Sequence, residues 1–258
     1  MKITTWNVNS LTARLTRAEN WLRANQSDVL CLQELKMETD KFPHDTFSLM
    51  GYRAEVFGQK TYNGVAILTK TSAPEPTNVV MGIPGFEDDQ RRAIAATIGD
   101  VRVICLYVVN GQAVDSDKFQ YKLRWLAAVT EWIASERAAH ENLVVVGDFN
   151  IAPTDADVHS PAEWAGQVLC TDEERAFFQR WLDLGLIDTF RQFDQPPKTF
   201  SWWDYRMLGF PKNRGLRIDH ILASPNMAER CTECVIDRNE RKGEKPSDHA
   251  PVTATFSL

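Results

Sequence analysis

Short runs of apolar, β-branched and aromatic residues recur along the whole chain and predict a protein rich in β-strands. We expect strands at Lys2–Trp6, Val29–Leu32, Gly64–Leu68, Ala93–Ile98, Val101–Tyr107, Leu143–Val146, Ile218–Ala223 and Val252–Phe256. Apolar residues three and four positions apart predict helices at Arg14–Asn25, Lys118–Arg137 and Glu173–Leu184. Thr171 is expected to cap the last of these helices and Gly185 to end it. The Pro- and Gly-richer stretch Ala73–Gly85 is expected to be an ordinary loop.

The order of these elements indicates the fold class. One helix follows the first strand, several strands then pass without a helix, and two long helices flank the strand Leu143–Val146. A single parallel sheet would need regular alternation of strands and helices, so two packed sheets with helices outside fit better. Because the chain has no internal repeat and no linker, residues 1–258 are expected to form one domain.

Composition narrows the protein class. The chain is 43% hydrophobic and 25% charged, as in ordinary globular proteins. The net charge of −6 argues against a general nucleic-acid-binding surface, although a local basic patch stays compatible with it. We find no signal-peptide pattern and no apolar stretch of membrane-spanning length, and we expect a soluble, cytoplasmic protein. Cys31 and Cys105 lie in apolar runs and are expected to be buried thiols, whereas Cys231 and Cys234 form a lone CxxC that is too little for a zinc site.

Two polar strings stand where apolar strands meet loops. Gly147–Asn150 follows the strand Leu143–Val146, and Asp248 and His249 precede the last strand. If the first strand continues, its two-residue period places Asp148 and Asn150 on one side; an Asx turn is the alternative. A histidine beside one aspartate, with a second aspartate at another strand end, is the arrangement that orients an imidazole and raises its pKa.

Further polar residues also fall at strand ends. Glu34 ends a buried strand, and a salt bridge to Lys36 and a metal-ligand role are equally compatible with its position. Asn7 and Tyr107 end other apolar runs, where each taken alone is explained by loop capping or packing. Asp219 opens an apolar run and could pair with a neighbouring arginine instead. Packing alone does not require acid, amide, imidazole and phenol to gather at strand ends, and carboxylates with an imidazole serve metal-assisted hydrolysis.

Taken together, these motifs resemble the exonuclease III family of AP endonucleases, within the endonuclease/exonuclease/phosphatase superfamily. The resemblance covers essentially the whole chain and rests on Thr5–Leu11, Leu32–Glu34, Asn63–Ala66, Tyr107, Gly147–Asn150, Phe200–Arg206, Gly215–Asp219 and Lys245–Pro251. It implies a four-layer αββα sandwich in which two packed mixed β-sheets are flanked by helices. It also implies a site that binds Mg²⁺ or Mn²⁺ at the strand ends, since oxygen ligands suit these ions.

The resemblance implies roles for individual residues as well. The metal set would be drawn from Asn7, Glu34, Asp148, Asn150, Asp248 and His249. Asp148 and Asn150 would position or deprotonate the attacking water, Asp219 would orient His249 on the scissile phosphate, and Tyr107 would donate to a phosphate oxygen. An apolar pocket for a base-free deoxyribose would be formed by Trp202, Leu216 and Ile218. Candidate contacts to the DNA backbone are Arg91, Arg92, Asn110, Lys118, Lys122, Lys212, Asn213 and Arg214.

The implied function is Mg²⁺-dependent DNA repair on duplexes that carry abasic sites, 3′ ends or 3′ blocks, by a monomer with no membrane partner. The chain departs from the family pattern at Val109, where relatives have proline, and at Leu35, where they have threonine. The segment 157–171 is expected to shape the DNA cleft. A catalytically weak nucleic-acid-binding regulator on the same fold is the alternative, but it should have lost site residues such as Glu34 or His249, and these are present. Phosphoinositide or sphingomyelin hydrolysis is a further alternative, against which the apolar pocket and the lack of a membrane-binding feature count.

Overall fold

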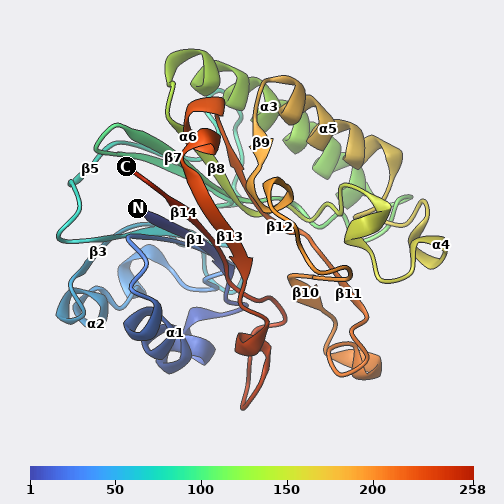
Figure 1. Cartoon of the computed structure of the whole chain (residues 1–258), viewed down its shortest axis with the longest axis horizontal. Coiled ribbons are helices and arrows are strands. Elements are labelled where there is room, and N and C mark those ends of the chain that lie inside the picture. Colours follow the sequence, from blue (N-terminus) through green and yellow to red (C-terminus); the bar gives the residue numbers. More distant parts are fainter.

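The computed structural model describes residues 1–258 and contains two six-stranded mixed sheets (Figure 1). In spatial order, the first sheet consists of β13 (Cys231–Ile236), β14 (Val252–Phe256), β1 (Lys2–Asn7), β2 (Val29–Gln33), β4 (Val65–Lys70) and β3 (Tyr52–Phe57). The second sheet consists of β5 (Pro76–Met81), β6 (Ala93–Ile98), β7 (Val101–Tyr107), β8 (Leu143–Asp148), β12 (Asp219–Ala223) and β9 (Ile187–Asp188). A short ribbon pairs β10 (Trp202–Trp203) with β11 (Gly215–Leu216).

Helices cover the outer face of each sheet. The first sheet is packed against α1 (Leu11–Asn25) and α2 (His44–Leu49), and the second against α3 (Asp117–Ala139) and α5 (Asp172–Asp183). Two short helices are α4 (Pro161–Trp164) and α6 (Pro225–Glu229). The 3₁₀ turns are η1 (Thr39–Lys41), η2 (Asp155–Asp157), η3 (Thr189–Gln192), η4 (Arg206–Leu208) and η5 (Arg238–Arg241). The expected αββα sandwich is therefore confirmed, and none of its helices combines the length and apolar character that crossing a bilayer requires.

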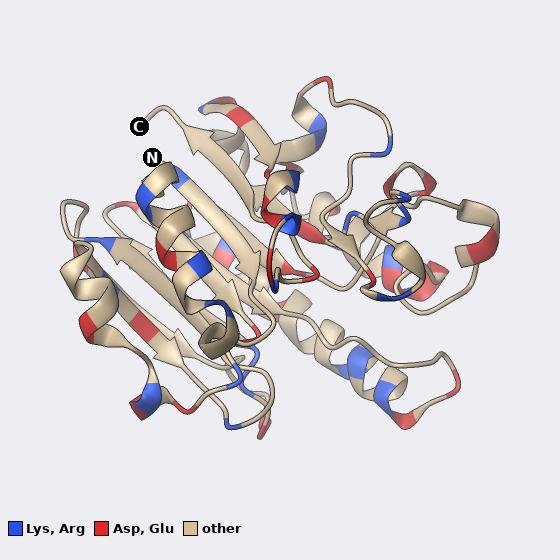
Figure 2. Ribbon diagram, turned by 90° about the horizontal axis from the view of Figure 1, so that it is seen from below, with Lys and Arg blue, Asp and Glu red and all other residues tan.

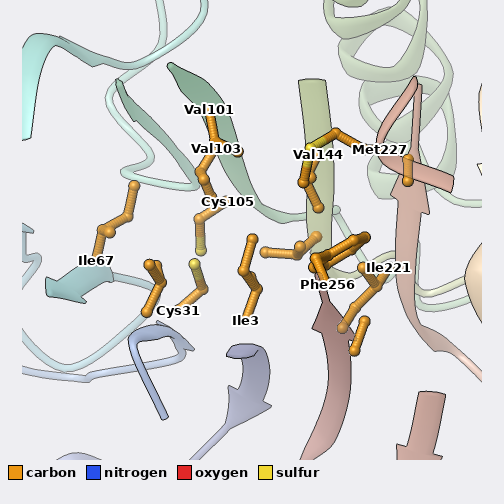
Figure 3. Close-up of a cluster of buried hydrophobic side chains, with 14 of the residues drawn as sticks. Ile3, Cys31, Ile67, Val101, Val103, Cys105, Val144, Ile221, Met227 and Phe256 are labelled. Carbon is orange, nitrogen blue, oxygen red and sulfur yellow. The ribbon is translucent and has the colours of Figure 1, made fainter. Parts of the chain in front are cut away.

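The two sheets pack face to face through a shared core (Figure 3). In β8, Val144 and Val146 point into this inter-sheet core, while Leu143 and Val145 point to the helices α3 and α5. Strands that are buried on both faces read as continuous apolar runs, which is why the sequence shows runs rather than alternation. Cys31 and Cys105 lie in the inter-sheet core as buried free thiols, as expected.

The expected strands and helices are all present, with ends that differ by a few residues at most. The expectation of a loop over Ala73–Gly85 is wrong, because this stretch contains the edge strand β5. β5 and the unpredicted strands β3 and β13 carry polar residues and are only partly buried, so their hydrophobic signal is weak. The predicted ends of α5 are confirmed: Thr171 caps it in a reciprocal capping box, and Gly185 follows it at a φ of 88°.

The direction of the strands brings their polar ends to one edge. β1 and β2 are parallel, as are β7 and β8, so within each pair the carboxyl ends lie together. β12 runs antiparallel to β8, and its first residue Asp219 pairs with Asp148, the last residue of β8. β14 runs antiparallel to β1, so the loop that precedes β14 meets the end of β1. Segments that are distant in sequence thus converge on one edge of the sandwich.

Candidate active site

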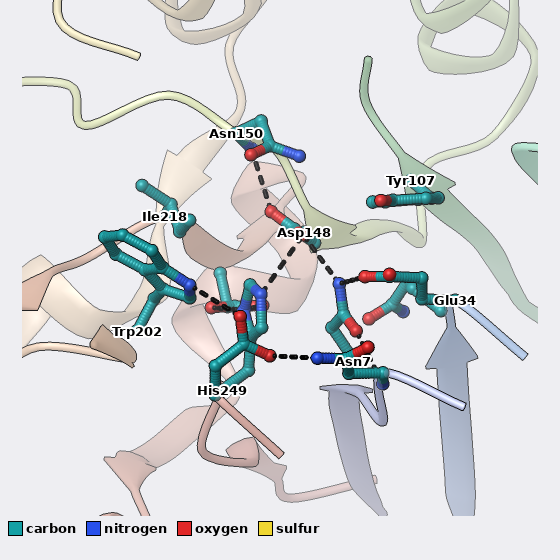
Figure 4. A network of polar contacts seen from close by, with 12 residues as sticks. Asn7, Glu34, Tyr107, Asp148, Asn150, Trp202, Ile218 and His249 are labelled. Carbon is teal, nitrogen blue, oxygen red and sulfur yellow. Dashed lines mark hydrogen bonds and ion pairs between the residues drawn. The ribbon is translucent and has the colours of Figure 1, made fainter. Parts of the chain in front are cut away.

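Asp219 and His249 form a hydrogen-bonded pair at this edge. Figure 4 shows His249 together with Asp148, Asn7 and Glu34. The Nδ1 atom of His249 is 2.9 Å from Asp219 Oδ2, and the hydroxyl of Ser201 donates to the same oxygen at 2.6 Å. All three side chains are buried. Because a carboxylate can only accept, Nδ1 carries a hydrogen, and the other ring nitrogen, Nε2, is turned toward Asp148 Oδ2 at 3.6 Å. Asp219 therefore fixes the orientation of the imidazole.

His249 is surrounded by carboxylates that decide its charge. Burial alone lowers the pKa of an imidazole, but the negative charges of Asp219, Asp148 and Asp248 outweigh burial and raise the pKa of His249 to about 10. The expectation of a raised pKa is thus confirmed, and the side chain is an imidazolium at neutral pH. A fixed positive charge of this kind can stabilise negative charge that develops on a phosphate.

Asp148 is buried at the end of β8, where the chain bends sharply. Its Oδ2 accepts from the amide of Asn7 at 2.9 Å, and its Oδ1 accepts from the backbone N–H of Asn150 at 3.0 Å. Burial raises the pKa of Asp148 to about 7, with His249 opposing and Asp219 adding to the rise. The preceding Gly147 has a φ of 150°, and a Cβ there would lie 1.9 Å from the carbonyl oxygen of Leu106. Only glycine lets β8 approach β7 so closely before the site.

The strand does not continue through Asn150. That residue has a left-handed backbone, at a φ of 47°, and the bond from its N–H to Asp148 forms the Asx turn that was the alternative interpretation. Its side-chain amide donates to the carbonyl of Val108 at 2.9 Å and accepts from Asn110 at 3.1 Å. The turn thus brings the amide of Asn150 beside the carboxylate of Asp148 by a local bond rather than by strand periodicity.

Glu34 lies on the first-sheet side of the edge. Its Oε2 accepts from the Asn7 amide at 2.9 Å, and its Oε1 forms a 2.9 Å ion pair with Lys36, so the salt bridge expected from the sequence is present. The same Asn7 nitrogen also bonds Asp148, which makes Asn7 a bridge between carboxylates of the two sheets. Figure 4 shows this bridge between Glu34 and Asp148.

Asp248 joins the site through uncharged partners. Its Oδ1 accepts from Asn9 at 2.9 Å, and its Oδ2 accepts from the indole of Trp202 at 3.0 Å. Neither Asn9 nor Ser201 was named from the sequence as a site residue. Their only sequence signal was their place inside the strings Thr5–Leu11 and Phe200–Arg206, where hydrogen-bonding residues stand next to strand ends.

Tyr107 ends β7 at the rim of the site. Its ring is stacked under the guanidinium of Arg92, 4.6 Å from the ring centroid. Burial raises the pKa of Tyr107 well above its ordinary value, and the nearby carboxylate of Glu34 adds to that rise against Arg92. The phenol therefore keeps its proton at neutral pH and can donate a hydrogen bond.

The donor chemistry of this edge fits a divalent cation. Glu34, Asp148 and Asp248 present carboxylate oxygens, with the amide of Asn7 between the first two, and such ligands suit Mg²⁺ or Mn²⁺. Among the carboxylates, Asp219 is committed to His249 and Ser201. The four carboxylates have only Lys36 and His249 as direct ionic partners, which leaves an excess of negative charge that a cation would balance.

The candidate DNA contacts differ in how far their side chains are exposed. Charged residues of both signs are interspersed over the chain (Figure 2). Asn110, Lys118, Lys212 and Arg214 are exposed, and Arg91 and Arg92 are half-buried. Asn213 has both ends of its amide engaged, with Trp203 and the carbonyl of Lys198. The expectation that Lys122 contacts DNA is wrong, because its side chain is fully buried in an ion pair with Glu174.

The residues expected to line an apolar pocket lie at two depths. Trp202 borders a cavity of about 890 Å³ whose other walls include His159, Trp164 and Arg214. Leu216 and Ile218 are not among its walls. They are fully buried below it, in an apolar cluster with Ala152, Val158, Leu169 and Cys170.

Comparisons with known proteins agree with this fold. The family model described as the endonuclease/exonuclease/phosphatase family matches residues 4–249. The chain is 39% identical over 269 residues to exodeoxyribonuclease III of Haemophilus influenzae, covering 99% of this chain and 100% of that protein. The solved structure of the 3′ phosphatase NExo from Neisseria, bound to a product DNA hairpin, is 50% identical with a TM-score of 0.97, and an AP endonuclease from Archaeoglobus fulgidus is 38% identical with a TM-score of 0.94. Both structures cover 100% of this chain and are themselves covered completely.

Proposed function

Because the chain belongs to the endonuclease/exonuclease/phosphatase family, within the group that contains exodeoxyribonuclease III, we propose that it is a Mg²⁺- or Mn²⁺-dependent DNA-repair phosphodiesterase. Its substrates would be duplex DNA with abasic sites, recessed 3′ ends or 3′-blocking phosphates. The observation that carries the proposal is the meeting of Asn7, Glu34, Asp148, Asp219 and His249 at one edge of the two sheets. The names of the similar proteins, which include a 3′ phosphatase and an AP endonuclease, support the same substrate class.

In this proposal the residues of the first sheet hold the cation. Glu34, Asn7 and Asp248 would bind it, and Asp148 would complete the oxygen set. A bound divalent cation would polarise a phosphate oxygen and neutralise developing charge. Lys36, 2.9 Å from Glu34, would keep one carboxylate oxygen in place. The cluster of Asp148, Asp219 and His249 is also compact enough to bind an ion, but the carboxylate of Asp219 is already bonded to His249 and Ser201.

The proton would be carried by Asp148 of β8, and the positive charge by His249, which lies in the loop that precedes β14 of the first sheet. Asp148, whose pKa is raised to about 7, can accept a proton from the attacking water at neutral pH while Asn150 orients that water. His249, held by Asp219, would place its positive charge on the scissile phosphate, and Tyr107 would donate to a phosphate oxygen. Each reaction would leave a free 3′ hydroxyl. A 3′ block would be released as phosphate and a 3′ end would lose a nucleotide, whereas incision at an abasic site would leave the abasic sugar phosphate at the 5′ end of the downstream strand.

Further expectations belong to the same proposal. The apolar residues Trp202, Leu216 and Ile218 would select a base-free sugar, and exposed cations such as Lys118 and Arg214 would contact the backbone. Residues 1–258 would act as one catalytic domain, because the inter-sheet core draws on strands from both halves of the chain. The domain would act as a monomer. The cytoplasm stays the predicted location.

The test is a side-by-side assay of the purified protein on three duplexes, with an abasic site, a recessed 3′ end or a 3′ phosphate. We expect Mg²⁺-dependent cleavage of at least one and its abolition by EDTA. Three intact substrates, or activity that EDTA leaves unchanged, would overturn the proposal. An undamaged blunt duplex with blocked ends is the control for contaminating nucleases.

A further inference from the structure

The segment that follows Asp148 is held by three side chains from three different elements. The carbonyl of Asn150 accepts from Lys122 of α3 at 2.7 Å. The next carbonyl, of Ile151, accepts from Nε2 of His220 of β12 at 2.9 Å, and that of Ala152 accepts from Arg175 of α5 at 3.0 Å. Successive loop carbonyls usually face water. Here each has a side-chain donor, so the path of residues 150–152 is fixed from outside the loop.

Lys122 is the most deeply buried of these donors. Its ammonium has three hydrogens, and the structure provides three acceptors: the carbonyls of Asn110 and Asn150, and the carboxylate of Glu174. A buried ammonium is costly unless it is paired and hydrogen-bonded, and here every donor is used. Two of the three bonds go to the backbone of the loops that follow β7 and β8, both of which border the candidate active site.

These two loops also contact each other through their asparagines. The amide of Asn110 donates to Asn150 at 3.1 Å, and both residues are bound through their carbonyls by the same ammonium. Asn150 has the left-handed backbone described above, which costs free energy for a non-glycine residue. Gly111 packs against the lysine stem, because a Cβ there would lie 3.1 Å from Lys122 Cδ.

We propose that Lys122 is a positioning residue, which holds Asn150 and Asn110 in place through their backbone carbonyls and does not contact DNA. Glu174 supports it by neutralising the buried charge, and His220 and Arg175 extend the same support along the segment. The inference rests on the proposed function, since the asparagine that it positions is the one assigned to the attacking water.

The test compares variants of the full-length protein. Lys122→Met removes the ammonium and keeps a straight apolar chain. The double variant Lys122→Met/Glu174→Gln also removes the unpaired buried carboxylate, and glutamine can still serve the capping box of α5. Replacing a buried ion pair by apolar or neutral residues is often harmless to stability. The double variant therefore separates positioning from folding.

The matched control is Arg102→Met. Arg102 of β7 pairs with Glu136, which lies on α3 as Lys122 does. The side chain of Arg102 is 3% exposed and thus nearly as buried as that of Lys122. Lys122 and Glu136 lie about 20 Å apart along α3, at a rise of 1.5 Å per residue. This control thus removes a buried cation of β7 whose partner lies on the same helix as Lys122, at a distance from the site.

We expect kcat of both Lys122 variants to fall by about 100-fold, the scale of a small misplacement at a reacting centre. KM for the duplex and the dependence of binding on salt should stay within about twofold of wild type, because no phosphate contact is lost. Amide hydrogen exchange of the peptide 148–153 should become faster in both variants and stay unchanged in Arg102→Met.

Retained kcat with a weaker, less salt-dependent binding of DNA would overturn the proposal and restore Lys122 as a backbone contact. An equal loss of kcat in Arg102→Met would overturn it too, because the effect would then be one of general stability. If wild type cleaves none of the three duplexes, the proposed function falls. Exchange of peptide 148–153 still tests the positioning role, and unchanged exchange would reject it.

Discussion

Asp148 and Asp219 are directly paired residues of the antiparallel strands β8 and β12, and the imidazole of His249 lies between their carboxylates. Two buried carboxylates this close repel each other unless a positive charge separates them. Because the pKa of His249 is raised, its imidazole is protonated at neutral pH and supplies that charge. The register of one strand pair therefore decides both the geometry and the electrostatics of the site.

Removing the imidazole tests this arrangement. We expect His249→Ala to lower kcat on a duplex substrate in the presence of Mg²⁺ by about 10²- to 10⁴-fold, the range of general acid–base side chains. Asp219→Asn should lower it as well, and the double variant should lose little more, because the two residues act as a unit. Single-turnover rates measure the chemical step. Exposed His44, outside the site, provides the control variant His44→Ala, and full additivity of the Asp219 and His249 effects would contradict the pairing.

Glu34 is expected to control the affinity for the cation. Glu34→Gln keeps the size of the side chain and removes its charge, so the Mg²⁺ concentration for half-maximal activity should rise at least about tenfold. Lys36→Met, which leaves the carboxylate in place, should change that concentration much less. A magnesium titration of activity, together with calorimetric titration of Mn²⁺, measures both variants. An unchanged requirement in Glu34→Gln would place the cation elsewhere.

Gly147 is expected to be indispensable to folding rather than to chemistry. In Gly147→Ala the new Cβ would lie 1.9 Å from the carbonyl oxygen of Leu106, and neither backbone can withdraw without breaking the β7–β8 pairing. We expect a loss of about 3 kcal/mol or more in the free energy of unfolding, measured by urea denaturation. Gly85→Ala is the control, because Gly85 also has a positive φ but no atom within 4 Å. Its cost should be only about 1 to 2 kcal/mol.

His220 should make the free energy of unfolding depend on pH. Burial first, and then the charge of Arg217, lower the pKa of His220 to about 4 from its ordinary value of 6.5. Below pH 6.5 the imidazole of His220 is protonated in the unfolded chain but stays neutral in the folded chain. The contribution of His220 to the free energy of unfolding is therefore complete above pH 6.5 and is lost as the pH falls toward 4. The full loss is roughly 3 kcal/mol at about 1.4 kcal/mol per pH unit.

Between pH 7 and 5.5 this loss should amount to about 1 kcal/mol in wild type. His220→Gln, which cannot titrate, should lack that part of the pH dependence while keeping the contribution of every other group. Urea denaturation at both pH values measures the difference. Identical pH dependence of wild type and variant would show that folding does not lower the pKa of His220.

The sequence alone indicated the strands buried on both faces, the long helices and the residue types of the site. Leu143–Val146 reads as a continuous apolar run because β8 is covered by a sheet on one face and by helices on the other. Local signals also set the ends of α5, because a capping box and a following glycine are short-range features. Edge strands such as β5 were missed, since their partly exposed residues carry no such pattern.

Only the tertiary structure decided what those residues meet. Lys122 has the sequence of an exposed helical lysine, yet packing of α3 against α5 buries it beside Glu174 and the backbone of Asn150. Likewise, nothing near Asn7 in the sequence indicates that its amide joins Glu34 to Asp148. Residue type and local spacing determine which chemistry a chain can offer. Strand register and burial depth depend on contacts between distant segments, and these decide which of the offered groups come together.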